Sequence, residues 1–191
     1  MPTRRESLLD AAIVLLGDHG VRAVTHRAVD AAAGVPAGSA SNLFRTRDAL
    51  FDGIVERFAA RERANWDELA TQADPRSPAA LAKTMAELAG EATTTHRTLT
   101  LARYAILVEA ARRPGLREQL ATSGARVNVY FTAWLRRAGS ADPGRDLDLV
   151  ANFWTGLVLH ELAIPDPAFD PEPRIAALLA NLIPDGSTDG P

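Results

Sequence analysis

Apolar residues recur every three or four positions along most of this chain, which is the spacing of one face of an α-helix. No segment alternates apolar and polar residues as a half-buried strand does. Gly20 follows the first apolar stripe, and Thr25 and Ser77 stand where N-cap residues are expected. The pattern therefore predicts an all-α protein of about nine helices, near residues 4–19, 25–32, 36–45, 47–73, 77–93, 97–112, 115–139, 146–164 and 174–183.

Two of the expected helices carry apolar residues on more than one face. Residues 101–111 are apolar except for Arg103 and Glu109, which predicts a central helix covered on several sides. Residues 146–164 have two apolar faces, and each needs a partner. One face is expected to pack on the core of its own chain. The other packs either on a second subunit or, as the alternative, inside the same chain. We favour a homodimer, with a subunit contact formed by Leu149, Phe153, Gly156, His160, Ile175, Leu178, Leu179 and Leu182.

Composition limits the chemistry and the location of the protein. The 191 residues include no cysteine, which excludes disulfides, thiolate metal sites and cysteine nucleophiles. The N-terminus lacks the apolar core of a signal peptide, and no window approaches the ~20 apolar residues that span a bilayer. We therefore expect a cytoplasmic protein with no membrane partner.

The net charge of -3 argues at first against a nucleic-acid partner, but the charge is unevenly distributed. Residues 1–63 hold nine arginines and eight acidic residues, a net charge of +1, so the remainder carries -4. Solvated helix surfaces commonly carry such charges, so the excess is a weak indication of DNA binding.

Small residues dominate residues 31–44, AAAGVPAGSASNLF. Gly34 is expected to end one helix, and Pro36 suits the first turn of a short second one. This arrangement is a helix-turn-helix unit, although most helical hairpins bind nothing. Residues as thin as Ala37 and Gly38 would let the second helix approach closely in a DNA major groove.

Two polar residues of the short helix have the spacing of a base-reading face. Ser39 and Asn42 lie three positions apart, so they are expected on one side of the helix, where either can bond a base edge. Asparagine suits adenine best, and Ala37 can contact a thymine methyl group.

The whole string VTHRAVDAAAGVPAGSASNLFRTRDALF, residues 24–51, resembles the N-terminal signature of TetR-family transcriptional regulators. The resemblance covers about fifty residues and rests on Thr25, Val29, Ala33, Gly34, Val35, Gly38, Phe44, Arg47, Ala49 and Leu50. Three residues depart from the family pattern. Ser41 replaces an aromatic that often contacts a phosphate, Leu43 replaces a ring, and Asp30 replaces a small apolar residue. Asp30 implies either altered helix packing or a local partner for its carboxylate.

The polar residues 185–191 predict a flexible tail. The resemblance implies a helix-turn-helix DNA-binding domain over residues 1–48 and a helical effector-binding and dimerisation domain over 49–184. It also implies a repressor that binds a palindromic operator in double-stranded DNA as a homodimer and is released by a small molecule. Arg47 is similar to the family's phosphate-binding lysine. The implied DNA contacts are Thr25, His26, Arg27, Ala37, Gly38, Ser39, Ser41, Asn42 and Arg47.

The larger domain is where the resemblance implies a pocket for an unknown small-molecule effector. The candidate lining residues are Tyr104, Leu107, Tyr130, Trp134 and Trp154. Aromatic residues at helical spacing belong more often to a core than to a pocket, so core packing is the alternative for each of them.

The sequence gives little support to catalysis. The four histidines are isolated, and His160–Glu161 lacks the second histidine that a helical zinc site needs. No nucleotide-binding glycine loop and no nucleophile elbow is found. We expect a protein that is not an enzyme and has no cofactor or metal; the alternative is a helical-bundle enzyme or a structural dimer that does not bind DNA.

Overall fold

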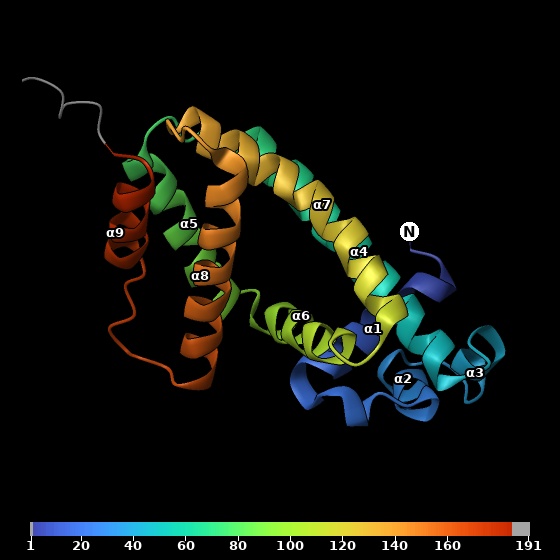
Figure 1. The fold of residues 1–191 in the computed structure, drawn as a ribbon. Helices are drawn as coiled ribbons and strands as arrows, with labels where there is room; N and C mark the ends of the chain where they lie inside the picture. The colour runs from blue at the N-terminus through green and yellow to red at the C-terminus, as the bar shows by residue number, and fades with distance from the viewer. Residues whose placement is uncertain (1, 185–191) are drawn as a thin grey trace, which may run out of the picture. The chain divides into compact units, whose positions relative to one another are not determined.

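The computed structural model describes residues 2–184, apart from the side chains of Ser123 and Arg126, so the tail expected at 185–191 lies outside the described residues. Within this range the chain forms nine α-helices and one short 3-10 helix, and no strand, which confirms the all-α prediction (Figure 1). The elements are α1 (Arg4–His19), η1 (Val21–Ala23), α2 (His26–Ala32), α3 (Ser39–Leu43), α4 (Arg47–Gln72), α5 (Pro78–Thr93), α6 (Arg97–Ala110), α7 (Pro114–Arg137), α8 (Pro143–Ala163) and α9 (Glu172–Leu182).

Local capping explains most of these boundaries. The Thr25 and Ser77 side chains accept hydrogen bonds from backbone N–H groups of the first turns of α2 and α5, as expected. Gly20, with φ +75°, follows the last residue of α1. Two starts were predicted wrongly: α3 begins at Ser39 and not at Pro36, and α8 begins at Pro143 because Asp142 already caps it.

The described chain divides into two compact units. The first unit contains the chain up to Asn65 and residues 96–124, and the second contains residues 66–95 and the described residues from Ala125 on. This division follows packing, and it differs from the domain boundary expected after residue 48, because α6 and the first half of α4 share a core with α1.

The first unit is built around the contact between α1 and α6. Gly17 lets the two helices approach closely, since a β-carbon at this position would lie 2.1 Å from the Thr98 carbonyl oxygen. The expectation that residues 101–111 are covered on several sides is wrong. Ile106 is fully buried, but Leu107 and Val108 are 40% and 56% exposed. The apolar core of this unit also includes Leu8, Leu9, Ile13, Leu16, Val29, Leu50, Ile54 and Phe58.

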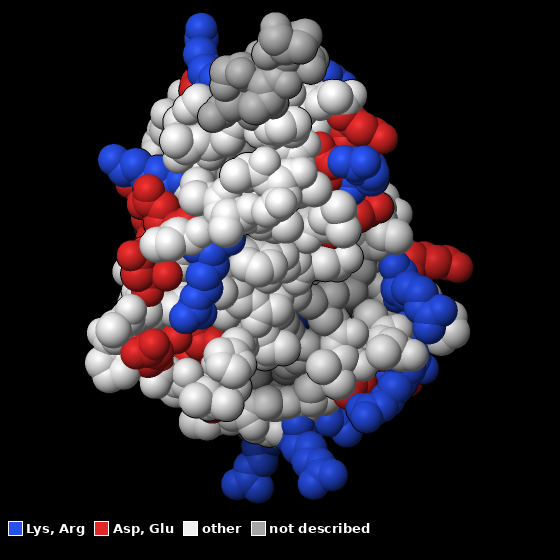
Figure 2. All heavy atoms as spheres, turned by 60° about the vertical axis from the view of Figure 1, so that its left-hand side comes forward, with Lys and Arg blue, Asp and Glu red and all other residues white. Residues whose placement is uncertain are grey.

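The second unit has its own core between α5, α7, α8 and α9. Ile175 and Leu179 were expected at the subunit contact, but both are fully buried within this core, because their face of α9 packs on α5. The view of Figure 2 shows a broad, mostly uncharged strip with acidic and basic side chains on both sides of it. Leu149 of α8 is 47% exposed, so the alternative of a helix buried wholly within one chain is wrong.

Among the described residues, no helix combines the length and the apolar character that a membrane crossing requires.

Candidate nucleic-acid interface

The turn between α2 and α3 depends on two glycines with left-handed backbone. Gly34 has φ +65° and Gly38 has φ +92°, values that residues with a β-carbon rarely adopt. Between them the Val35 N–H donates to the Asp30 carbonyl oxygen at 3.0 Å, which ends α2. The chain therefore turns sharply, and α3 packs on α2 at an angle to it (Figure 1).

One face of α3 is fixed in the core and the other faces solvent. Ala40 is fully buried and Phe44, just after the helix, is almost fully buried in the first unit's core. Ser41, Asn42 and Leu43 are exposed. Ala37 is exposed in the preceding turn, and Gly38 is partly exposed. The helix therefore presents a short, uncharged outer surface, on which Leu43, 49% exposed, is the largest side chain.

Ser39 and Asn42 do not share this outer surface as the spacing predicted. Ser39 is only 8% exposed, and its hydroxyl donates to the Pro36 carbonyl oxygen at 2.5 Å and accepts from Arg4 Nη2 at 2.8 Å. The Ser41 hydroxyl is also bound locally, to the Gly38 carbonyl oxygen at 3.0 Å. Asn42 is therefore the best-placed polar residue of α3 for a base edge.

The Asp30 carboxylate has local partners, which is one of the two alternatives that its departure from the family pattern implied. The Gly38 N–H donates to Oδ2 at 2.8 Å and the Ala40 N–H donates to Oδ1 at 2.7 Å. The side chain is 3% exposed. A carboxylate from α2 thus caps the N-terminus of α3, where Gly38 itself has no side chain to do so.

His26 and its neighbours were expected to contact phosphates. The His26 ring lies against the end of α3, with Nε2 2.7 Å from the Phe44 carbonyl oxygen. A carbonyl oxygen only accepts, so Nε2 carries the donated proton. Thr25 and Arg27 are exposed, although the Thr25 hydroxyl oxygen accepts from the Ala28 N–H at 3.2 Å.

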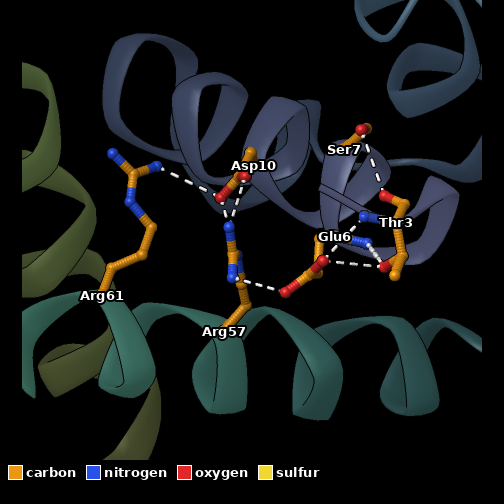
Figure 3. A network of polar contacts seen from close by, with 6 residues as sticks. All are labelled: Thr3, Glu6, Ser7, Asp10, Arg57 and Arg61. Atoms are coloured by element: carbon orange, nitrogen blue, oxygen red, sulfur yellow. Dashed lines mark hydrogen bonds and ion pairs between the residues drawn. The ribbon is translucent and has the colours of Figure 1, made fainter. Parts of the chain in front are cut away.

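Basic side chains lie around the helix-turn-helix. Arg47 is exposed at the start of α4, and its Nη2 donates to the Val21 carbonyl oxygen at 3.0 Å. Arg5 lies over the Phe44 ring, with its guanidinium carbon 5.5 Å from the ring centroid. Arg57 of α4 bonds Asp10 and Glu6 of α1, which links these two helices (Figure 3).

The residues expected at an effector pocket are distributed over both units. Tyr104 and Leu107 belong to the first unit, whereas Tyr130, Trp134 and Trp154 belong to the second. Trp134 is fully buried, and Trp154 Nε1 donates to the Met85 carbonyl oxygen at 3.1 Å. The Tyr130 hydroxyl donates to an Asp67 carboxylate oxygen.

An aromatic cluster in the second unit was not predicted. The Trp66 ring centroid lies 4.8 Å from that of Phe131 and 6.3 Å from that of Trp134, and both pairs meet edge to face. The spacing of three between Phe131 and Trp134 places them on one helix face, but nothing in the sequence pairs that face with Trp66.

The residues expected at the subunit contact lie on α8 and α9. Phe153, Gly156 and His160 line an open hollow together with Asn152, Leu157 and Arg174. Gly156 and His160 are exposed, and Leu178 and Leu182 are partly buried against the second unit's core. Among the apolar side chains expected at this contact, that of Leu149 is the most exposed, at 47%, whereas Phe153 is partly buried like Leu178 and Leu182.

An exposed short helix after a glycine turn is the geometry of a helix-turn-helix unit, and here a separate helical unit follows it. Two family models match the sequence. "Bacterial regulatory proteins, tetR family" matches residues 8–54, and "Tetracyclin repressor-like, C-terminal domain" matches residues 76–185. The chain belongs to the TetR family of bacterial transcriptional regulators.

Solved structures of similar proteins agree with this assignment. SCO1917 of Streptomyces coelicolor A3, described as a member of the TetR family, is 29% identical with a TM-score of 0.67, over 96% of this chain and 100% of that one. The multidrug binding protein EbrR in complex with ethidium is 27% identical with a TM-score of 0.72, over 95% of this chain and 99% of that one. EbrR also has a structure with proflavin, 28% identical to this chain with a TM-score of 0.66, over 95% of this chain and 100% of that one. None of the curated proteins compared with the sequence matches it.

Proposed function

We propose that this protein is a homodimeric repressor that reads a palindromic operator with α3 and leaves it when a small molecule binds. The observation that carries the proposal is the outer surface of α3, where Asn42 is exposed beside small residues while Ala40 and Phe44 hold the inner face. This surface fits a major groove, and the amide of Asn42 matches the donor and acceptor of adenine.

Phosphate contacts in this proposal come from the residues around the reading helix. The exposed candidates are Thr25 and Arg27, which precede α3 in the sequence, and Arg47, which follows it. Arg47 has further guanidinium N–H groups besides the one that bonds the Val21 carbonyl oxygen. His26 and Ser39 are not assigned phosphate or base contacts in this proposal, since His26 Nε2 and the Ser39 hydroxyl are bonded within the protein. Ser41 reaches a phosphate only by giving up its bond to Gly38.

A twofold axis is required because one short helix contacts only a few base pairs. Two α3 helices held about 34 to 36 Å apart would read half-sites separated by one turn of the duplex. The exposed face of α8, with Leu149, Phe153 and Gly156, supports pairing of two chains through the second unit. An exposed apolar surface of this kind is typical of a subunit contact.

The effector proposed for this chain is a planar aromatic cation. EbrR has been crystallised with ethidium and with proflavin. The second unit offers Trp66 and Phe131, both partly buried, and the carboxylate of Asp67. Aromatic faces and a carboxylate suit a flat cation.

Selection from a randomised duplex library tests the DNA-binding part. The purified chain is expected to enrich an inverted repeat. Because ethidium also intercalates into duplex DNA, its binding is measured on the protein alone, where ethidium is expected to bind and an uncharged planar aromatic of similar size is expected not to. Failure to retain any duplex at low salt would favour a helical-bundle enzyme or a structural dimer.

A further inference from the structure

His26 and Asp30 stand one turn apart on α2, and each bonds one end of α3. Asp30 accepts the Gly38 and Ala40 N–H groups at 2.8 and 2.7 Å, at the start of the helix. His26 Nε2 donates to the Phe44 carbonyl oxygen at 2.7 Å, just beyond its last residue. Because residues four apart on a helix share a face, one face of α2 holds both ends of α3.

The α3 helix needs stabilising contacts from other parts of the chain. It contains only five residues, Ser39–Leu43, and isolated helices this short are unstable in water. Its first N–H groups and last carbonyls have no partners within the helix, and no side chain of its own caps it. Asp30 also places a negative charge at the positive end of the helix. The two side chains thus satisfy backbone groups that the chain leaves open at each end.

We propose that His26 and Asp30 form a clamp that sets the pose of α3, and thereby controls discrimination between DNA sequences more than overall attraction to DNA. The inference rests on the proposed function, since it takes α3 as the reading helix. Asp30 is 3% exposed and negatively charged, so it does not bind phosphates itself. The general attraction comes from arginines on other elements, such as Arg47 on α4, and survives loss of the clamp.

Four variants separate the two bonds and allow rescue. Asp30→Ala and His26→Ala remove one end of the clamp each. Asp30→Asn keeps one acceptor oxygen and His26→Gln keeps an N–H donor, so both retain part of the contact. Asp52→Ala is the matched charge control. Asp52 is exposed on α4, so its replacement removes the same charge from a helix other than α3.

Affinity is measured for the duplex that the wild-type protein selects and for a random duplex, each over a range of salt. Asp30→Ala and His26→Ala are expected to lower the preference for the selected duplex about tenfold or more, with an unchanged salt slope. Asp30→Asn and His26→Gln are expected to recover part of the preference, and Asp52→Ala is expected to keep all of it. The Gly38 and Ala40 amides of Asp30→Ala are expected to exchange with solvent faster than in the wild type.

Equal losses on the selected and the random duplex, or an undiminished preference in both alanine variants, would overturn the clamp while leaving the regulator intact. A wild-type protein that selects no sequence would instead overturn the proposed function itself. If Asp30→Ala does not fold, Asp30→Asn and His26→Ala decide the question, because an unchanged preference in both rejects the clamp.

Discussion

Arg57 of α4 holds Asp10 of α1 by two parallel hydrogen bonds, from Nε to Oδ1 at 2.9 Å and from Nη2 to Oδ2 at 2.8 Å (Figure 3). The third nitrogen, Nη1, reaches Glu6 Oε1 at 3.0 Å, and Arg61 adds a longer bond to Asp10 at 3.3 Å. Such a bidentate pair is stronger than an ordinary surface ion pair. It fixes α1, which carries the N-terminal arginines, against α4, the helix that follows α3.

Replacing Arg57 with methionine is expected to lower the free energy of unfolding by about 1 kcal/mol at neutral pH, since both partners are partly exposed. The side-chain hydrogen bond from Arg57 is the main cause that lowers the pKa of Asp10 below its usual value of 3.8. A carboxylate with a lowered pKa stabilises the fold above that usual value, and the contribution is lost as the pH falls through the folded-state pKa. The difference between the two proteins in urea unfolding should therefore shrink below pH ~4.

Arg76→Met is the matched control for this measurement. Arg76 also pairs with a carboxylate, Asp74 at 2.7 Å, but its side chain is 81% exposed. The control is expected to unfold like the wild type, and a loss equal to that of Arg57→Met would contradict the role of the α1–α4 pair.

Gly17→Ala is expected to destabilise the protein by about 3 kcal/mol, because the new β-carbon would meet the Thr98 carbonyl at the α1–α6 contact. Gly90→Ala is the control, since a β-carbon there has no atom within 4 Å and alanine favours a helix. Denaturation followed by circular dichroism compares the two. Equal midpoints for Gly17→Ala and the wild type would show that the two helices do not touch at this point.

The helices could be predicted because their signals are local. Apolar spacing and caps such as Thr25 and Ser77 lie within a few residues of the boundaries that they set. The contacts of α3 could not be predicted. Asp30 meets Gly38 and Ala40 only because the turn between them folds back, and the sequence alone left altered packing open as an alternative.

The sequence also did not show which element packs against each apolar helix face. The stripe of α9 was assigned to a second subunit, but Ile175 and Leu179 face α5 within the chain. Periodicity shows that a face is covered and does not show by which element. For the same reason the pairing of Trp66 with Phe131 escaped prediction.

Asn42→Ala is expected to lose preference at one base pair of the selected duplex, at a cost of about 1 to 3 kcal/mol, because the amide would no longer match an adenine edge. Binding to a random duplex should stay as it was. Gel shifts on duplexes with each base at each position measure this. Equal losses on selected and random DNA would contradict a base-reading role.

Arg47→Ala is expected to weaken binding to all duplexes alike and to lower the slope of log affinity against log salt by about 1. The physical reason is the loss of one phosphate contact and of the ions that it releases. Arg136→Ala serves as the control, because Arg136 is exposed on α7 and belongs to the second unit, whereas Arg47 belongs to the first. A loss confined to the selected duplex would assign Arg47 to base reading.

Gly156→Gln is expected to weaken dimerisation without harming the single chain. Gly156 is exposed on α8, and a β-carbon there meets no atom of the chain within 4 Å. Glutamine also favours a helix over glycine by about 0.5 to 1 kcal/mol, so the folded chain should gain stability. Two α8 helices that pair at Gly156 would be forced apart by the longer side chain.

Sedimentation equilibrium should then show a dimer dissociation constant raised about tenfold or more. Gly90→Gln is the matched control, because Gly90 also lies within a helix and leaves open space for a β-carbon, but on α5. The control is expected to dimerise like the wild type. If both variants dimerise equally well, the expected subunit contact on α8 is wrong, because Leu149, 47% exposed, and Gly156 lie two turns apart on the same face of this helix.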